Sequence, residues 1–118
     1  MRGVLTANFL AVLPEREQRL VQYLANGEHH RTRAMLKAGY ARSTAHKQQA
    51  RVIERPRVQQ ALLAIEYERE GSGWLTNEEL RMIGVNVRSV RQLERRKLEA
   101  EAEASARIAV ARVFARRR

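Results

Sequence analysis

The feature that most constrains the fold of this chain is the spacing of its apolar residues. They recur three or four positions apart between glycines and prolines, the spacing that places side chains on one face of an α-helix. After Pro56, apolar residues follow this spacing in the order Val58, Ala61, Leu62 and Ile65. The alternation of apolar and polar residues that is typical of strands is weak throughout. The sequence therefore predicts an all-α fold.

Prolines and glycines divide the first half of the chain into short helices. Pro14 followed by Glu15 predicts a helix start, because proline fits the first turn and an acidic side chain favours the positive end of the helix dipole. Asn26-Gly27 predicts its end. A second helix is expected over residues 29–38, and Gly39 permits the sharp reversal that should follow it.

A third helix is expected to run without interruption to about Ile53, with a fourth starting at Pro56. The third helix has two different sides. The side expected to pack carries Ala45, Gln49, Val52 and Ile53. The opposite side carries Ser43, Lys47 and Arg51.

Gly71, Ser72 and Gly73 predict a hinge over residues 71–75. Thr76 followed by Glu79 predicts a capping box that starts a long helical segment over residues 76–115, interrupted or bent at Gly84. This segment begins with an apolar stripe expected to mediate oligomerisation: Leu80, Ile83, Val87 and Val90. A single helix of about 60 Å could not bury this stripe against a small head, so the segment either folds back as a hairpin or packs on other subunits.

The predicted organisation therefore has five parts. An N-terminal arm covers residues 1–12, a head of short helices covers residues 13–70, and the hinge covers residues 71–75. The oligomerisation segment covers residues 76–115, and a basic tail covers residues 116–118.

The charge of the chain indicates a polyanionic partner. Lys and Arg number 23 against 13 Asp and Glu, which gives a formal net charge of +10. Residues 29–57 contain eight Lys and Arg side chains and a single carboxylate, that of Glu54. This stretch is where phosphates are expected to sit. The chain has no cysteine, so its fold cannot depend on disulfides or thiolate metal sites.

Three short helices with a glycine turn before a basic third helix are typical of a helix-turn-helix, which places one helix in the major groove of double-stranded DNA. The residues expected to contact DNA are Arg31, Arg33, Arg42, Ser43, Thr44, Lys47, Gln48, Arg51, Arg55 and Arg57. Among these, Lys47, Gln48 and Arg51 could reach base edges. Arg31, Arg33, Arg55 and Arg57 are expected to meet phosphates.

The amino-acid sequence of this region resembles that of the terminase small subunits of tailed bacteriophages. The resemblance covers about Leu13 to Ile65 and is carried by Leu13-Pro14, Glu17, Leu20, Val21, Tyr23, Ala38-Gly39-Tyr40, Thr44-Ala45, Gln48, Arg51-Val52-Ile53, Pro56 and Val58. Family members usually have Ser-Pro directly after the Gly-Tyr pair, whereas this chain has Ala41-Arg42. We therefore expect Ser43 to replace the missing cap of the third helix.

The resemblance implies a DNA-packaging protein. Such a protein recognises viral DNA in the cytoplasm of the infected host, assembles as a homo-oligomeric ring and regulates a separate large terminase subunit that holds the ATPase and nuclease. It implies no cofactor and no catalytic residue in this chain.

Two other classes of function compete with this hypothesis. A transcription regulator would use the long helical segment to pair two heads over a palindromic site. A nuclease or recombinase accessory domain would need a metal site. However, the adjacent His29 and His30 diverge on a helix, and the pair Glu78-Glu79 fits a helix start. We therefore expect neither catalysis nor a bound metal.

Some features of the chain are expected to be structural. No apolar run reaches the roughly 18–20 residues of a membrane span, and the apolar start of the chain has Asn8 within it, so neither membrane insertion nor secretion is expected. Tyr23, Tyr40 and Trp74 are expected to complete small cores rather than to touch DNA.

Overall fold

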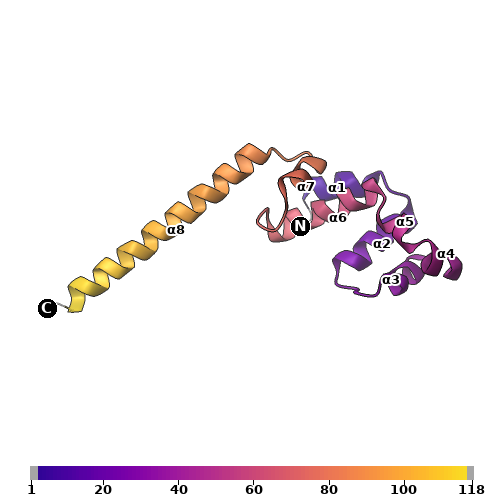
Figure 1. The fold of residues 1–118 in the computed structure, drawn as a ribbon, viewed down its shortest axis with the longest axis horizontal. Helices are drawn as coiled ribbons and strands as arrows, with labels where there is room; N and C mark the ends of the chain where they lie inside the picture. The colour runs from indigo at the N-terminus through magenta and orange to yellow at the C-terminus, as the bar shows by residue number, and fades with distance from the viewer. Residues whose placement is uncertain (1–2, 117–118) are drawn as a thin grey trace. The chain divides into compact units, whose positions relative to one another are not determined.

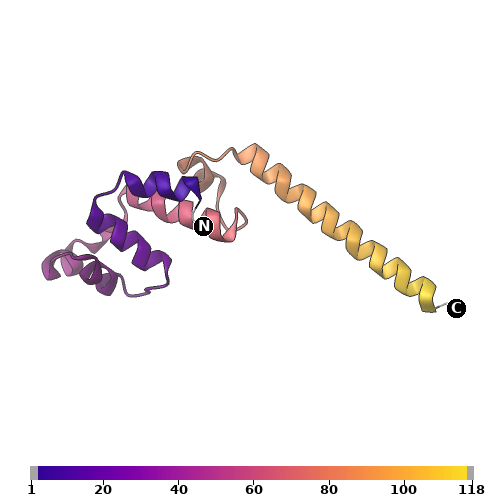
Figure 2. The same cartoon turned by 180° about the vertical axis from the view of Figure 1, so that it is seen from behind.

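The computed structural model describes residues 3–116, and in these residues the protein is all-α. The chain forms two compact units that divide after Gly84. The first unit contains α1 to α7, and the second contains α8 (Val87–Arg116). Figure 1 shows the helices in chain order and Figure 2 shows them from behind. Arg117 and Arg118 of the predicted basic tail lie outside the described residues.

The segment expected to be an N-terminal arm forms a helix, α1 (Val4–Ala11), that packs on α6 (Pro56–Glu70). Both views show the two helices side by side (Figures 1 and 2). Near the start of α1, the backbone N–H and the hydroxyl of Thr6 donate hydrogen bonds to the carboxylate of Glu68. The N-terminal segment is therefore part of the first unit, because a carboxylate far along the chain satisfies donors of its first turn.

Two predicted helix starts are confirmed. The helix α2 (Glu15–Ala25) begins directly after Pro14, and α6 has Pro56 in its first turn. The helix α3 (Arg31–Ala38) begins two residues later than predicted and ends at Gly39. Gly39 has a φ of 103°, a left-handed conformation that side chains with a Cβ rarely adopt.

The predicted third helix is interrupted. It consists of α4 (Arg42–Lys47) and α5 (Gln49–Ile53), separated at Gln48, whose φ of −121° departs from helical geometry. Hydrogen bonds continue across the interruption, because the N–H of Gln48 donates to the carbonyl of Thr44 and the N–H of Val52 donates to the carbonyl of Gln48. The prediction of one continuous helix is therefore wrong, and the interruption leaves these backbone groups satisfied.

Two apolar clusters hold the first unit together. One joins α2, α3, α4 and α5 and consists of Leu20, Ala34, Met35, Ala38, Ala45, Val52 and Ile53. The other joins the end of α1, α2 and α6 and consists of Leu10, Leu13, Val21, Val58, Ala61 and Ile65. Because α2 contributes to both clusters, it fixes the basic segment to the rest of the unit.

The region after the predicted hinge differs from the prediction. The capping box of Thr76 and Glu79 is confirmed, with both reciprocal hydrogen bonds present, but the helix that it starts, α7 (Asn77–Met82), has only six residues. The chain leaves the helix before Gly84, which has a φ of 76°. Residues 71–84 belong to the first unit, so the boundary between units lies after Gly84 rather than at residues 71–75.

Half of the predicted oligomerisation stripe is unavailable to another subunit. Leu80 and Ile83 are buried in the first unit, where α7 contacts α6. Val87 and Val90 lie in α8 and are partly exposed. The predicted stripe is divided because α7 and α8 are separate helices. Residues that would share one face of a continuous helix therefore belong to different units.

A substitution at Ala45 tests the packing of α4. Ala45 is fully buried in the first cluster, so Ala45→Asp should place an unpaired carboxylate in an apolar environment and lower the free energy of unfolding by at least about 3 kcal/mol. Ser43→Asp is a matched control on the same helix, because Ser43 is exposed. Urea denaturation should show a large loss for Ala45→Asp only. Equal stability of the two variants would contradict the assigned faces of α4.

Candidate nucleic-acid interface

The polar residues of α4 and α5 form an exposed face opposite the buried one. The residues Arg42, Ser43, Lys47, Gln48 and Arg51 are exposed, and Thr44 is partly buried. On the inner side, the amide of Gln49 donates a hydrogen bond to the hydroxyl of Thr32 in α3 at 2.7 Å. This contact ties α5 to α3, so the exposed side chains project from a packed pair of elements.

The start of α4 is not capped as predicted. The residue at the N-cap position is Ala41, which has no side chain that can accept a hydrogen bond. Ser43 lies inside the helix, one residue beyond its first position, where its hydroxyl cannot serve as the N-cap. The expectation that Ser43 caps this helix is therefore wrong.

The cations of α3 differ in whether they form a salt bridge. Arg31 and Arg33 are exposed, whereas the ammonium of Lys37 lies 2.8 Å from the carboxylate of Glu28 and 5.8 Å from the centre of the Tyr23 ring. The hydrogen bond from Lys37 holds the pKa of Glu28 below its ordinary value. Lys37 is therefore already partly neutralised.

Arg55, predicted to meet a phosphate, is held by a carboxylate of the protein itself. Its guanidinium donates to Glu17, whose side chain is only 8% exposed, whereas that of Arg55 is 52% exposed. The pair is therefore asymmetric: the carboxylate lies inside and the guanidinium covers it. Arg57, two residues later, is exposed.

Six cations of the basic segment remain without a carboxylate partner among residues 3–116: Arg31, Arg33, Arg42, Lys47, Arg51 and Arg57. All six are exposed and belong to α3, α4, α5 and the start of α6. Uncompensated positive charge on adjacent elements attracts an anionic partner, and this attraction weakens as salt rises.

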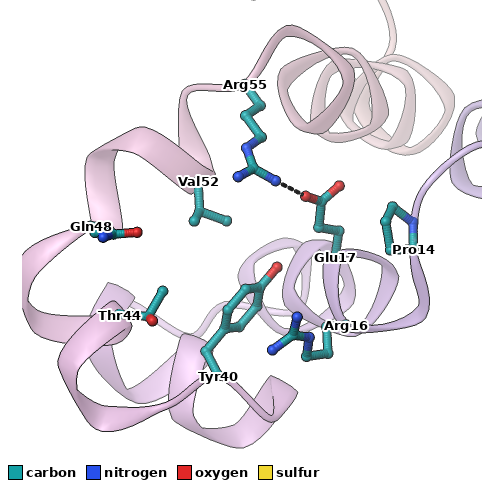
Figure 3. Close-up of a pocket in the computed structure, with 8 residues that line it drawn as sticks. All are labelled: Pro14, Arg16, Glu17, Tyr40, Thr44, Gln48, Val52 and Arg55. Carbon is teal, nitrogen blue, oxygen red and sulfur yellow. Dashed lines mark hydrogen bonds and ion pairs between the residues drawn. The ribbon is translucent and has the colours of Figure 1, made fainter.

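The structure also forms a pocket that the sequence analysis did not predict. The pocket has a volume of about 230 Å³ and lies between α2, the turn after α3 and α4. Figure 3 shows the residues that line it: Pro14, Arg16, Glu17, Tyr40, Thr44, Gln48, Val52 and Arg55. Arg16 and Tyr40 were not among the predicted site residues. Their proximity depends on how α2 packs against α3 and α4, and no local sequence pattern reports that packing.

The three aromatic residues expected to pack behave differently. Tyr40 packs against the first cluster as predicted, and the guanidinium of Arg16 lies 5.0 Å from the centre of its ring. Tyr23 is 37% exposed, and Trp74 is 85% exposed. The expectation that Trp74 completes a core is wrong, because it lies exposed in the loop between α6 and α7 and belongs to neither apolar cluster.

The histidine and acidic side chains of the described residues do not gather in one place. No group of three or more of these described side chains could hold a metal ion. His29, His30 and His46 are all exposed. None of the helices over residues 3–116 combines the length and the apolar character needed to cross a bilayer.

Comparison of the chain with protein-family models, with curated proteins and with solved structures gives no match.

The Arg55–Glu17 pair predicts a stability effect that is separate from any ligand. Arg55→Ala should leave the buried Glu17 carboxylate without its partner and lower the free energy of unfolding by about 1–2 kcal/mol. Arg57→Ala removes the same charge from an exposed side chain that has no such partner, so it should change stability little. Chemical denaturation of both variants checks this, and an equal effect would show that the ion pair contributes nothing.

Proposed function

We propose that this protein binds double-stranded DNA through the exposed side of α3, α4 and α5, with α4 entering the major groove. The observation that carries the proposal is the division of α4 and α5 into two faces. Ala45, Val52 and Ile53 are buried, whereas the cations on the other side are exposed and lack carboxylate partners within the described residues. A short packed helix with a basic outer face is the element that helix-turn-helix proteins insert into the major groove.

The positions of the candidate residues support different roles. Lys47, Gln48 and Arg51 are exposed at and beside the junction of α4 and α5, and their donors suit the acceptors that guanine and adenine present in the major groove. Arg31, Arg33 and Arg57 lie on flanking elements and suit phosphates on either side of the groove. Arg55 is also assigned to a phosphate, with its guanidinium oriented by Glu17.

We further propose that the protein is a small terminase subunit that recognises viral DNA for genome packaging in the infected host cell and acts on a separate large subunit. Support for this finer assignment comes from the resemblance of residues 13–65 to that family. The all-α fold and the short helices joined at Gly39 are consistent with it. In this role the chain contributes binding, and catalysis belongs to its partner.

The long helix α8 supports assembly with other copies of the chain. It has 30 residues, and its apolar side chains are largely exposed, including Leu93, Leu98, Ile108, Val113 and Phe114. Helices in proteins gain most of their stability by burying apolar side chains against other elements, so these exposed side chains favour association. Several DNA-binding units held in one assembly would bind a single duplex more tightly than one unit alone.

Two substitutions test the DNA-binding face. Lys47→Ala and Arg51→Ala should each weaken binding to duplex DNA by about 1–3 kcal/mol without loss of helicity, because both side chains are exposed. Fluorescence anisotropy with a labelled duplex at low salt measures this effect. Arg81→Ala is the control, because Arg81 is an exposed cation of α7, which contacts α6 rather than α4. If all three variants bind equally, the face is misassigned.

The number of subunits separates the proposed packaging protein from a transcription regulator. A small terminase subunit should form a closed ring of more than two copies, whereas a regulator that reads a palindrome should be a dimer. Native mass spectrometry of the full chain gives the stoichiometry. A ring supports the packaging role, a dimer favours the regulator, and a monomer at micromolar concentration would contradict both assemblies.

A further inference from the structure

We propose that the pocket between α2, the turn after α3 and α4 binds one phosphate group of the DNA backbone, held by Arg16, Arg55 and the hydroxyl of Tyr40. The inference rests on the proposed DNA-binding function and adds a site to it. Arg16 and Tyr40 come from outside the residues assigned above, and the pocket fixes where the backbone runs beside α4.

The donors of the pocket are available to a ligand. Among the described residues, the hydroxyl of Tyr40 has no hydrogen-bond partner, and neither do the side chains of Thr44 and Gln48. Figure 3 shows the Tyr40 hydroxyl pointing toward the Arg55–Glu17 pair, with Arg16 beside the ring. Burial raises the pKa of Tyr40, and the nearby Glu17 carboxylate raises it further, so the hydroxyl stays protonated and can donate.

The carboxylate in the pocket does not prevent anion binding. Glu17 accepts from Arg55 and is nearly buried, whereas the Arg55 guanidinium is half exposed. A guanidinium has five N–H donors, so one contact to Glu17 leaves others free for a second acceptor. With Arg16 and Arg55 against one carboxylate, the pocket retains a net positive charge.

Arg16 is held in place before any ligand arrives. Its guanidinium carbon lies 5.0 Å from the centre of the Tyr40 ring, which favours a cation over the ring face. Its Cγ and Cδ also lie 3.8 Å from the position that a Cβ at Gly39 would occupy, so its stem follows the turn. A side chain that is already ordered loses less conformational freedom when it binds.

The position of the pocket beside α4 suits a phosphate of the DNA backbone. Two polar residues at α4 line the pocket: Thr44, which lies in α4, and Gln48, which directly follows α4. The exposed Lys47 precedes Gln48. A DNA strand whose bases face α4 would therefore place one of its backbone phosphates at the opening of the pocket.

The test uses the full chain and a labelled duplex of mixed sequence, with affinity measured between about 50 and 200 mM salt. Arg16→Gln should lower the slope of log K against log salt by about 0.9, the change expected when one phosphate contact is lost. Arg16→Lys keeps the charge and should keep the slope. Tyr40→Phe removes only the hydroxyl, so it should weaken binding about three- to tenfold with the slope unchanged.

Arg19→Gln is the matched control, because Arg19 lies on the same helix, is exposed and pairs with Glu15 at 3.3 Å outside the pocket. Thermal melts of each variant exclude unfolding as the cause. If Arg16→Gln and Tyr40→Phe bind DNA as Arg19→Gln does, the pocket is not a phosphate site, although the proposed function stands. If the unaltered chain binds no duplex, both the function and the pocket assignment fail.

Discussion

The close packing of α3 against α4 is the contact on which the rest of the basic segment depends. Ala34 and Ala38 of α3 and Ala45 of α4 are fully buried, and their small side chains let the two helices approach closely. Gly39 makes the reversal between them in a left-handed conformation. Because one side of α4 is committed to this core, its polar and cationic side chains can only face outward.

The cations of the basic segment differ in whether they form an ion pair within the protein. Lys37 and Arg55 pair with Glu28 and Glu17, so part of their charge is used within the protein. The exposed cations without such ion pairs are the ones that we propose contact DNA. In the pocket beside α4, the buried Glu17 pairs with Arg55 while the ring of Tyr40 lies against Arg16.

The fold was predictable where a local signal dictates it. Pro14 and Pro56 mark helix starts, and Thr76 with Glu79 forms a reciprocal cap. The predictions that were wrong concern contacts between residues distant in sequence, or backbone geometry that no glycine or proline marks. The Glu68 contact makes residues 4–11 a docked helix, and the interruption at Gln48 occurs without glycine or proline. The break near Gly84 was predicted, but the burial of Leu80 and Ile83 was not, because it depends on the contact of α7 with α6. Of the site, the outward face was predictable from periodicity, whereas the pocket required the packing of α2.

The proposal that the exposed cations of α3, α4 and α5 form a surface for duplex DNA can be tested by titrating the unaltered chain with a labelled duplex in dilute buffer and repeating the titration as salt is raised. We expect saturable binding whose affinity falls steeply and linearly on a log–log plot, because several phosphates are neutralised at once. An absence of binding at the lowest salt, or an affinity indifferent to salt, would contradict it.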